Sequence, residues 1–307
     1  MTRRTRFVAA AALAAGLAGE TGLVAFADNS MAALQVPVMV STEWVAAHAN
    51  DPDVLLVHVE MAQMRRGPSS FVPGAVLLDY HSIEDSSSLP IELPPVDALV
   101  RAFEAIGVSN DTHVVLYGPA PAHLAARAFV TLEYLGHDRV SLMDGGVGAW
   151  IAEGRAVVDV PANPQPAHFE PSVNADMLVD AEWIAARLDD PQIAVLDARP
   201  AGQFAGATMP TLRDGHIPGA GNIFYGDFLE SEEVHRLLPR RQAMEMLAAA
   251  GAGPGKTIVS YCQIGMRASY NYVVARHLGY DVKFYDGSWA DWGRREDLPA
   301  ETGPQER

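Results

Sequence analysis

The sequence predicts an α/β protein built from two tandem domains, each with a central parallel sheet flanked by helices. An internal repeat is the first observation, because residues 40–47 (VSTEWVAA) recur as residues 179–186 (VDAEWIAA). The second observation is that the following strands are short and apolar without polar alternation, as in a sheet covered on both faces. Segments of helical periodicity separate these strands in both halves, which is the third observation.

The repeat continues in the same order along each half. An Asp-Pro pair precedes the first apolar strand, and a Pro-Gly-Ala turn follows it. A helical segment that ends near a glycine, a second strand, a second helix and an Asp-Gly turn before a tryptophan complete the unit. The paired strands are residues 54–57 and 193–196, then residues 113–117 and 257–261.

The proline distribution divides the chain. We expect a first domain over residues 38–158 and a second domain over residues 176–300. Between them, residues 159–175 contain four prolines and show no clear period, which is typical of an extended linker.

The first 27 residues resemble an export signal. Three arginines within the first six residues precede an Ala- and Leu-rich run, and Ala-Phe-Ala at residues 25–27 fits a cleavage site. We therefore expect a periplasmic or secreted protein with no membrane segment after the signal is removed. A start at Met31 would instead leave the protein in the cytoplasm. The formal net charge of −16 argues against a nucleic-acid partner, whose phosphates it would repel.

The only cysteine, Cys262, follows the strand predicted at residues 257–261. A short loop with Gly265 leads from it into a helix that begins near Arg267. A helix N-terminus presents unpaired N–H groups and partial positive charge, and an arginine adds a full charge. Both effects favour the thiolate over the thiol, so we predict that Cys262 is a nucleophile. The alternative is a cysteine that only fills space in the core.

The loop spacing separates two kinds of cysteine chemistry. Cys262 and Arg267 form Cys-x4-Arg, one residue shorter than the Cys-x5-Arg loop of cysteine phosphatases. A smaller ring of amides suits a single outer sulfur better than a tetrahedral phosphate. One cysteine forms no internal disulfide, and no Cys/His cluster has metal-ligand spacing. A phosphatase or arsenate reductase is therefore the less favoured enzyme class.

Residues 262–269 (CQIGMRAS) resemble the active-site loop of rhodaneses, the thiosulfate and 3-mercaptopyruvate sulfurtransferases. The resemblance extends over residues 38–299 and implies two tandem rhodanese-like domains. It implies transfer of sulfane sulfur from thiosulfate to a thiol or cyanide through a persulfide on Cys262, without metal or cofactor. The residues it marks for substrate binding are Gln263, Ile264, Gly265, Met266, Arg267, Ala268 and, in the cleft, Arg213.

The first domain is predicted to be non-catalytic. Aligning the repeats places Gly118 where the second half has Cys262, and prolines without N–H groups follow it. By resemblance, the first domain is a scaffold, and we expect a substrate cleft between the halves with Cys262 at its floor.

The sulfur donor is the open question of the resemblance. Arg213 stands where mercaptopyruvate enzymes have one carboxylate-binding arginine, but Gln203 replaces their second, which favours thiosulfate. Asp197 and Arg199 are interpreted mainly as a buried ion pair. Mercaptopyruvate as donor remains the alternative, as does a persulfide carrier that does not turn over. We expect a monomer.

Overall fold

The computed structural model describes residues 36–61, 69–90, 92–119, 122–206, 213–231 and 234–304. The predicted export signal and Met31 lie outside these residues. Within them, no helix combines the length and the apolar character that a membrane crossing requires.

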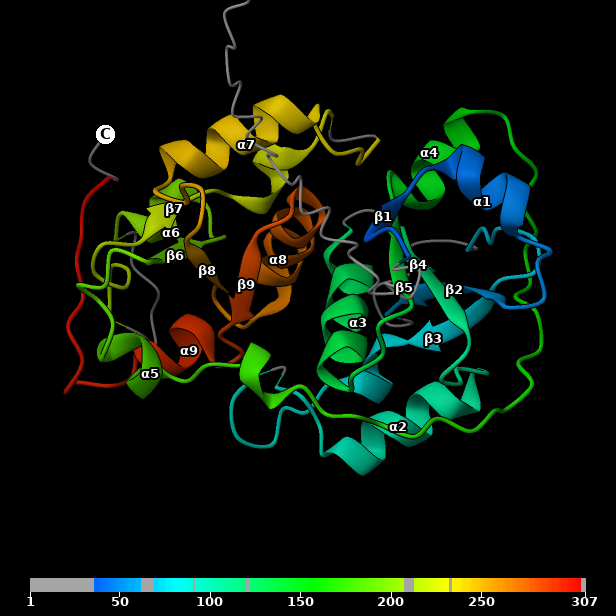
Figure 1. The fold of residues 1–307 in the computed structure, drawn as a ribbon, viewed down its shortest axis with the longest axis horizontal. Helices are drawn as coiled ribbons and strands as arrows, with labels where there is room; N and C mark the ends of the chain where they lie inside the picture. Colours follow the sequence, from blue (N-terminus) through cyan, green and yellow to red (C-terminus); the bar gives the residue numbers. More distant parts are fainter. Residues whose placement is uncertain are drawn as a thin grey trace, which may run out of the picture. The chain divides into compact units, whose positions relative to one another are not determined.

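Two parallel sheets confirm the predicted fold class (Figure 1). The first has the strand order β1-β5-β4-β2-β3 and the second β7-β6-β8-β9, with every named pair parallel. The first sheet comprises β1 (Met39–Val40), β2 (Val54–Glu60), β3 (Val76–Asp79), β4 (His113–Tyr117) and β5 (Val140–Met143). The second comprises β6 (Ile193–Asp197), β7 (Gly221–Asn222), β8 (Thr257–Tyr261) and β9 (Asp281–Phe284).

Helices flank both sheets, as the repeat predicts. In the first half they are α1 (Thr42–His48), η2 (Tyr80–Ile83), α2 (Val96–Ala105), α3 (His123–Tyr134) and α4 (Gly146–Ala152). In the second half they are η3 (Ala175–Met177), α5 (Ala181–Ala185), α6 (Ala201–Phe204), η4 (Tyr225–Phe228), α7 (Arg240–Ala249), α8 (Met266–Leu278) and α9 (Ser288–Trp292).

The repeated tryptophan segment begins a helix in both halves for the same reason. Ser41 Oγ accepts a hydrogen bond from the amide of Trp44, and Asp180 Oδ1 accepts one from the amide of Trp183. Both residues are N-caps, which satisfy an amide that the helix itself leaves without a partner.

The tyrosines that end β4 and β8 show that the halves are structurally equivalent. The hydroxyl of Tyr117 accepts from Val72 N at 2.9 Å, and that of Tyr261 accepts from Ile217 N at 3.2 Å. The next residue is Gly118 in the first half and Cys262 in the second, as the sequence alignment predicts.

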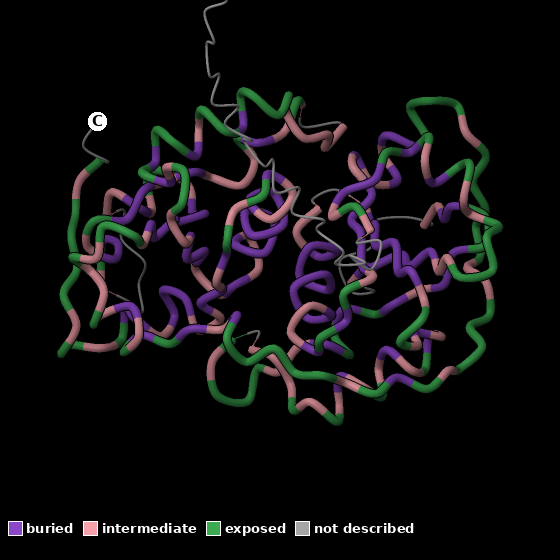
Figure 2. Tube along the Cα trace, viewed as in Figure 1, coloured by how far each residue is buried: buried purple, intermediate pink, exposed green. Residues whose placement is uncertain are grey.

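Helices α3 and α8 join the two halves. Both are buried over most of their length (Figure 2), and they pack against each other. A helix that is buried nearly all round needs cover on every side, and each of these helices covers the other. One hydrophobic cluster accordingly contains side chains from both halves, whereas separate clusters lie on the outer side of each sheet.

The proline-rich segment after α4 contains no helix or strand up to Asn174. Its backbone bonds to the first half: Ala162 N donates to Ala75 O at 2.8 Å, and Ala167 N donates to Glu104 O at 3.0 Å.

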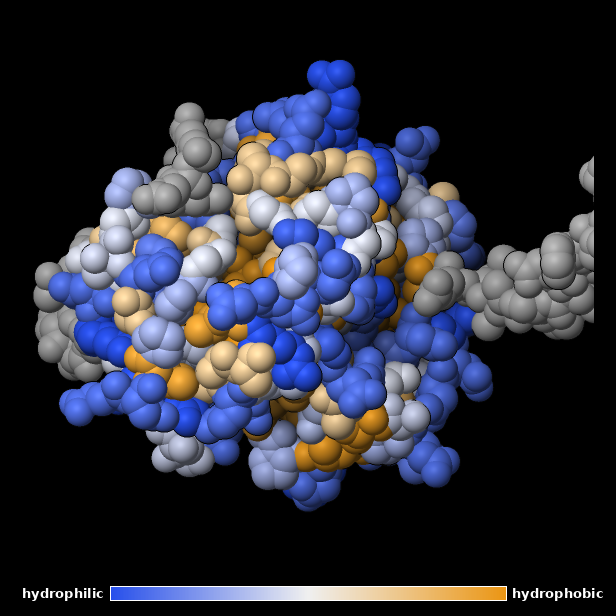
Figure 3. Space-filling model, turned by 60° about the vertical axis from the view of Figure 1, so that its left-hand side comes forward, coloured by the Kyte–Doolittle hydropathy of each residue, from blue (hydrophilic) through white to orange (hydrophobic). Residues whose placement is uncertain are grey.

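The face of the molecule in Figure 3 mixes hydrophilic side chains with small apolar areas. Val160, in the proline-rich segment, is 73% exposed.

Gly118, directly after β4, has no room for a side chain. A Cβ atom added to Gly118 would lie 2.5 Å from the carbonyl oxygen of Val59, too close for any real contact. We expect Gly118→Ala to destabilise the protein by about 1–3 kcal/mol, measured by denaturant unfolding. Gly253→Ala is the control, because nothing lies within 4 Å of its Cβ position. Equal stability of the two variants would contradict this packing.

Stability should fall in mild acid because His113 is buried. Its Nε2 lies 2.8 Å from Ser141 Oγ, and burial, helped by the charge of Arg139, lowers its pKa to about 4. The unfolded chain takes up this proton near pH 6.5, so the free energy of unfolding decreases as the pH falls from 6.5 towards 4. We expect this group to contribute a slope of up to about 1.4 kcal/mol per pH unit. Denaturant unfolding across this range should show a shallower slope for His113→Gln, and identical slopes would refute the assignment.

Candidate active site

Cys262 occupies the position the sequence predicts, directly after β8 and three residues before the N-cap of α8. The residue as a whole is only 1% exposed. Cys262 does not line the polar cavity described below or four others in the described part of the chain, so the cleft expected above it remains a prediction.

Gly265 is required at the N-cap of α8. Its φ is +78°, in the left-handed region that side chains disfavour. A Cβ there would also lie 3.0 Å from Asp286 Oδ1 and 3.1 Å from Arg127 Nη1. Gly265 therefore combines an unusual backbone conformation with the close approach of two charged side chains.

The amides of the loop fall into two groups. Those of Cys262 and Gly265 donate to Ser288 Oγ at 3.2 and 3.0 Å. The second group has no hydrogen-bond acceptor among the described residues, and α8 has no side-chain cap. The amides of this group belong to Gln263, Ile264, Met266, Arg267 and Ala268. The loop thus keeps a row of N–H donors available for an anion.

Ser288 fixes this arrangement. It is fully buried, and its hydroxyl donates to Tyr285 O at 2.9 Å while accepting the two loop amides. Its φ of +51° makes it the only non-glycine residue in the left-handed region within the described chain. Such backbone conformations persist where the surroundings impose them, often at functional sites.

Arg267 is half-buried and forms no ion pair with a described carboxylate. His123, the first residue of α3, lies near this arginine. Burial, helped by the charge of Arg267, lowers the pKa of the His123 imidazole to about 4. Tyr225 also lies within its electrostatic reach. The charge of Arg267 is therefore available to an anionic ligand, because no described carboxylate neutralises it.

Asp197 and Arg199 form the predicted buried ion pair, with Arg199 Nη2 2.6 Å from Asp197 Oδ2. The same guanidinium donates to Gly215 O at 2.8 Å and lies 4.6 Å from the ring centre of Trp289. The pair is a tie between β6 and the neighbouring loops.

The guanidinium of Arg213 already donates hydrogen bonds within the protein, unlike an arginine that waits to bind a substrate carboxylate. Nη1 donates to Leu298 O at 2.6 Å, and Nη2 donates to Trp292 O at 3.2 Å. Residues 207–212, which precede it, lie outside the described chain. Its link to Cys262 runs through Trp289, whose indole N–H donates to Arg213 O and whose amide donates to Cys262 O.

Four residues around the loop were not predicted from the sequence. They are Ser288, Asp286 and, from the first half, Arg127 and Tyr80. The hydroxyl of Tyr80 is buried without a hydrogen-bond partner, and burial raises its pKa above the usual value.

The repeat contained a signal for Ser288. It replaces Gly146 of the first half, which has a φ of +54°, so the two residues share one backbone conformation. A Cβ at Gly146 would lie 2.7 Å from Gly118 O, so the two glycines pack closely where the second half has Ser288 and Cys262.

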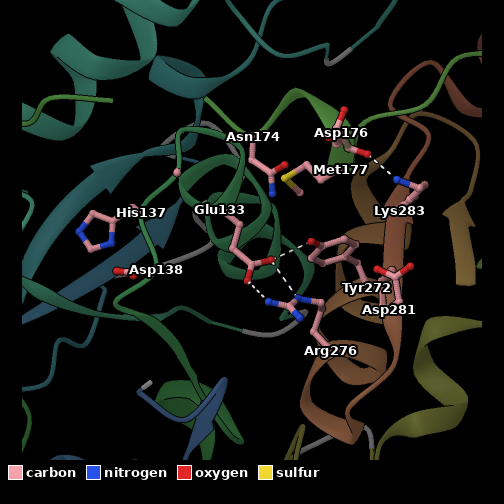
Figure 4. Close-up of a pocket in the computed structure, with 12 residues that line it drawn as sticks. Glu133, His137, Asp138, Asn174, Asp176, Met177, Tyr272, Arg276, Asp281 and Lys283 are labelled. Atoms are coloured by element: carbon pink, nitrogen blue, oxygen red, sulfur yellow. Dashed lines mark hydrogen bonds and ion pairs between the residues drawn. The ribbon is translucent and has the colours of Figure 1, made fainter. Parts of the chain in front are cut away.

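A polar cavity of about 350 Å³ lies between the later parts of α3 and α8 (Figure 4). Glu133, Tyr272 and Arg276 meet in it, and no residue of the 262–267 loop lines it. It is not the reaction site we expect, because it contains no nucleophile of the kind the loop provides. No group of three or more His, Cys, Asp or Glu in the described chain is arranged to hold a metal.

Comparison with known proteins identifies the family. The rhodanese-like domain model matches residues 41–153 and 180–295. A probable 3-mercaptopyruvate sulfurtransferase of Pseudomonas aeruginosa is 32% identical over 283 residues, covering 86% of this chain and 98% of the relative. A thiosulfate sulfurtransferase of the same organism is 30% identical over 274 residues, covering 87% and 97%. The sulfur carrier protein TtuD of Thermus thermophilus is 32% identical over 290 residues, covering 87% and 98%.

A solved structure shares the fold. The wild-type structure of EanB aligns with a TM-score of 0.77 and 23% identity, over 88% of this chain and 70% of that chain. Two matched domains, two equivalent parallel sheets and full-length relatives at 30% identity or more lead to one conclusion. The chain belongs to the rhodanese family and is a tandem-domain sulfurtransferase.

Proposed function

We propose that the protein transfers sulfane sulfur from thiosulfate to a thiol or cyanide through a persulfide on Cys262. The observation that carries this proposal is the row of loop amides that have no acceptor among the described residues, beside the only cysteine of the sequence. These donors are suited to an anion on the sulfur, as the amides of an oxyanion hole are suited to oxygen.

The reaction has two covalent steps. The Cys262 thiolate attacks the outer sulfur of thiosulfate, a new sulfur–sulfur bond forms, and sulfite leaves with the electron pair of the bond that breaks. The acceptor then attacks the outer sulfur of the persulfide, so cyanide becomes thiocyanate and the thiolate is regenerated. The loop amides without a described acceptor stabilise the negative outer sulfur, and Arg267 attracts the anionic donor.

The deep position of Cys262 does not choose between donors. The residue is only 1% exposed, so its sulfur has little contact with solvent in this structure. Thiosulfate and mercaptopyruvate both present a terminal sulfur atom to it.

The relatives support two alternatives. Proteins named 3-mercaptopyruvate sulfurtransferase, from Pseudomonas aeruginosa and Escherichia coli, favour that donor. Against it, the Nη groups of Arg213 are already bonded to carbonyl oxygens, and Gln203 takes the place of a second arginine. A relative named as a sulfur carrier favours transfer to a protein partner without turnover.

Several features of the whole chain belong to the proposal. Residues 38–158 form a non-catalytic domain, because Gly118 has no room for a side chain. Residues 159–175 are the linker and residues 176–300 the catalytic domain. We further propose a monomeric protein that is exported after removal of residues 1–27.

Intact mass spectrometry tests the reaction directly. Incubation with thiosulfate should add one sulfur atom to the protein, and cyanide should remove it, because the persulfide is the only stored intermediate. Cys262→Ser should gain no mass. No gain in the unmodified protein with either thiosulfate or mercaptopyruvate would refute the proposal, and the ratio of kcat/KM for the two donors identifies the preferred one.

Ser288 should control the rate of persulfide formation. Ser288→Ala leaves the amides of Cys262 and Gly265 without their acceptor, so the loop loses its fixed shape. We expect persulfide formation about tenfold slower or more, and a loss of about 1–3 kcal/mol in stability.

Ser288→Gly separates the two contributions of this residue. Glycine adopts the φ of +51° without strain but has no hydroxyl. It should therefore be more stable than the alanine variant yet equally slow. Normal rates in both variants would show that the hydroxyl does not position the loop.

A further inference from the structure

A buried ion pair connects the first half of the chain to the loop that contains Cys262. Arg127 of α3 has a fully buried side chain, and its Nη1 lies 2.6 Å from Asp286 Oδ1. The second oxygen of Asp286 accepts from Leu93 N, also of the first half, at 3.0 Å. Two groups of the first domain therefore hold one carboxylate of the second.

This ion pair packs directly on the N-terminus of α8. The Cβ position of Gly265 lies within 3.1 Å of both charged groups, so the pair forms the wall against which the glycine sits. Asp286 also precedes Ser288 by two residues, and Ser288 holds the amides of Cys262 and Gly265. Moving Asp286 would therefore disturb the loop both through Gly265 and through Ser288.

The equivalent place in the first half has no arginine from the opposite central helix, because the positive charge near Asp144 comes from Arg236, which is not part of α8. Asp144 corresponds to Asp286 in the repeat, and its Oδ1 likewise accepts an amide of the other half, that of Leu237, at 2.8 Å. The α8 side chain that faces Asp144 is Tyr270, not an arginine. Of these two equivalent places, only the one beside the cysteine has a buried ion pair with the opposite central helix.

Removing two charges from water costs free energy, which the ion pair regains only when its geometry is good. Such a pair therefore contributes more to a defined geometry than to stability. Arg127 also lies 5.3 Å from the ring centre of Phe284, which fixes its guanidinium from a second side. The side chain therefore has little freedom to move away from Asp286.

We propose that Arg127 is a positioning residue of the Cys262 site, through which the first domain holds the loop amides in the shape that persulfide formation requires. The inference rests on the proposed function. It gives the first domain a part in the reaction although it has no nucleophile.

The structure offers a matched control in another ion pair between the two halves, which joins α3 to α8. Arg276 Nη2 lies 2.8 Å from Glu133 Oε1, and Tyr272 donates to the other oxygen of Glu133 (Figure 4). Arg276 is ten residues after the start of α8, about 15 Å along its axis. Breaking this pair weakens contact between the halves without touching the loop.

The experiment measures kcat and KM for thiosulfate together with the melting temperature. Asp286→Asn, which keeps the shape of the side chain, and Arg127→Gln should each lower kcat about tenfold or more and change KM about twofold or less. Arg127→Lys retains the charge and should recover part of the loss. Arg276→Gln should lower the melting temperature but leave kcat within about twofold of the unmodified protein.

The outcomes distinguish a positioning role from a structural one. If Asp286→Asn and Arg127→Lys both keep normal kcat while melting as early as Arg276→Gln, the pair is only structural and the inference is wrong. Should Arg127→Gln fail to fold, these two variants still decide.

A second measurement tests the positioning role of Arg127 even if the proposed function is wrong. The alkylation rate of Cys262 by iodoacetamide requires no sulfur donor. If the unmodified protein accepts no sulfur, the proposed function fails, but slower alkylation in Asp286→Asn than in Arg276→Gln still shows that the pair positions the loop. Equal alkylation rates would overturn the inference.

Discussion

Two hydrogen bonds from the loop after β8 to one buried hydroxyl determine the shape of the site. Ser288 Oγ accepts the amides of Cys262 and Gly265, and the other amides of the turn have no acceptor among the described residues. Most of these residues are half-buried and three belong to the first turn of α8, where N–H groups without partners are available to water or to an anion. The helix dipole of α8 adds to the attraction for an anion at the same point.

The two halves show how one fold supports both an active and an inactive version of this turn. In the second half, Cys262 and Ser288 fill the space between the end of β8 and the turn after β9. In the first half, Gly118 and Gly146 take these places, and backbone atoms approach so closely that no side chain fits. A side chain at Gly118 would therefore need the backbone of the first half to move. What the first half presents to the second is the buried surface of α3 and the charge of Arg127.

Much of this architecture follows from local sequence patterns. Ser41 and Asp180 mark helix starts, apolar runs mark β4 and β8, and the repeat locates Cys262 between strand and helix. The ion pair of Asp197 and Arg199 is also local, since the residues are two apart. Arg127 and Asp286 were not predicted, because they are far apart in the chain and only tertiary packing brings them together. The near-complete burial of Cys262 depends on packing in the same way.

The mutual packing of α3 and α8 has a consequence for biosynthesis. Nine consecutive residues of α3, from Leu124 to Leu132, are buried in the finished protein, and part of that cover comes from α8. During synthesis, α3 leaves the ribosome long before α8 is made. The nascent first half therefore exposes an apolar helical surface. Such an intermediate is a target for chaperones and prone to aggregate until the chain is complete. Each half therefore needs the other to complete the burial of its central helix, although the two halves are copies of one unit in the sequence.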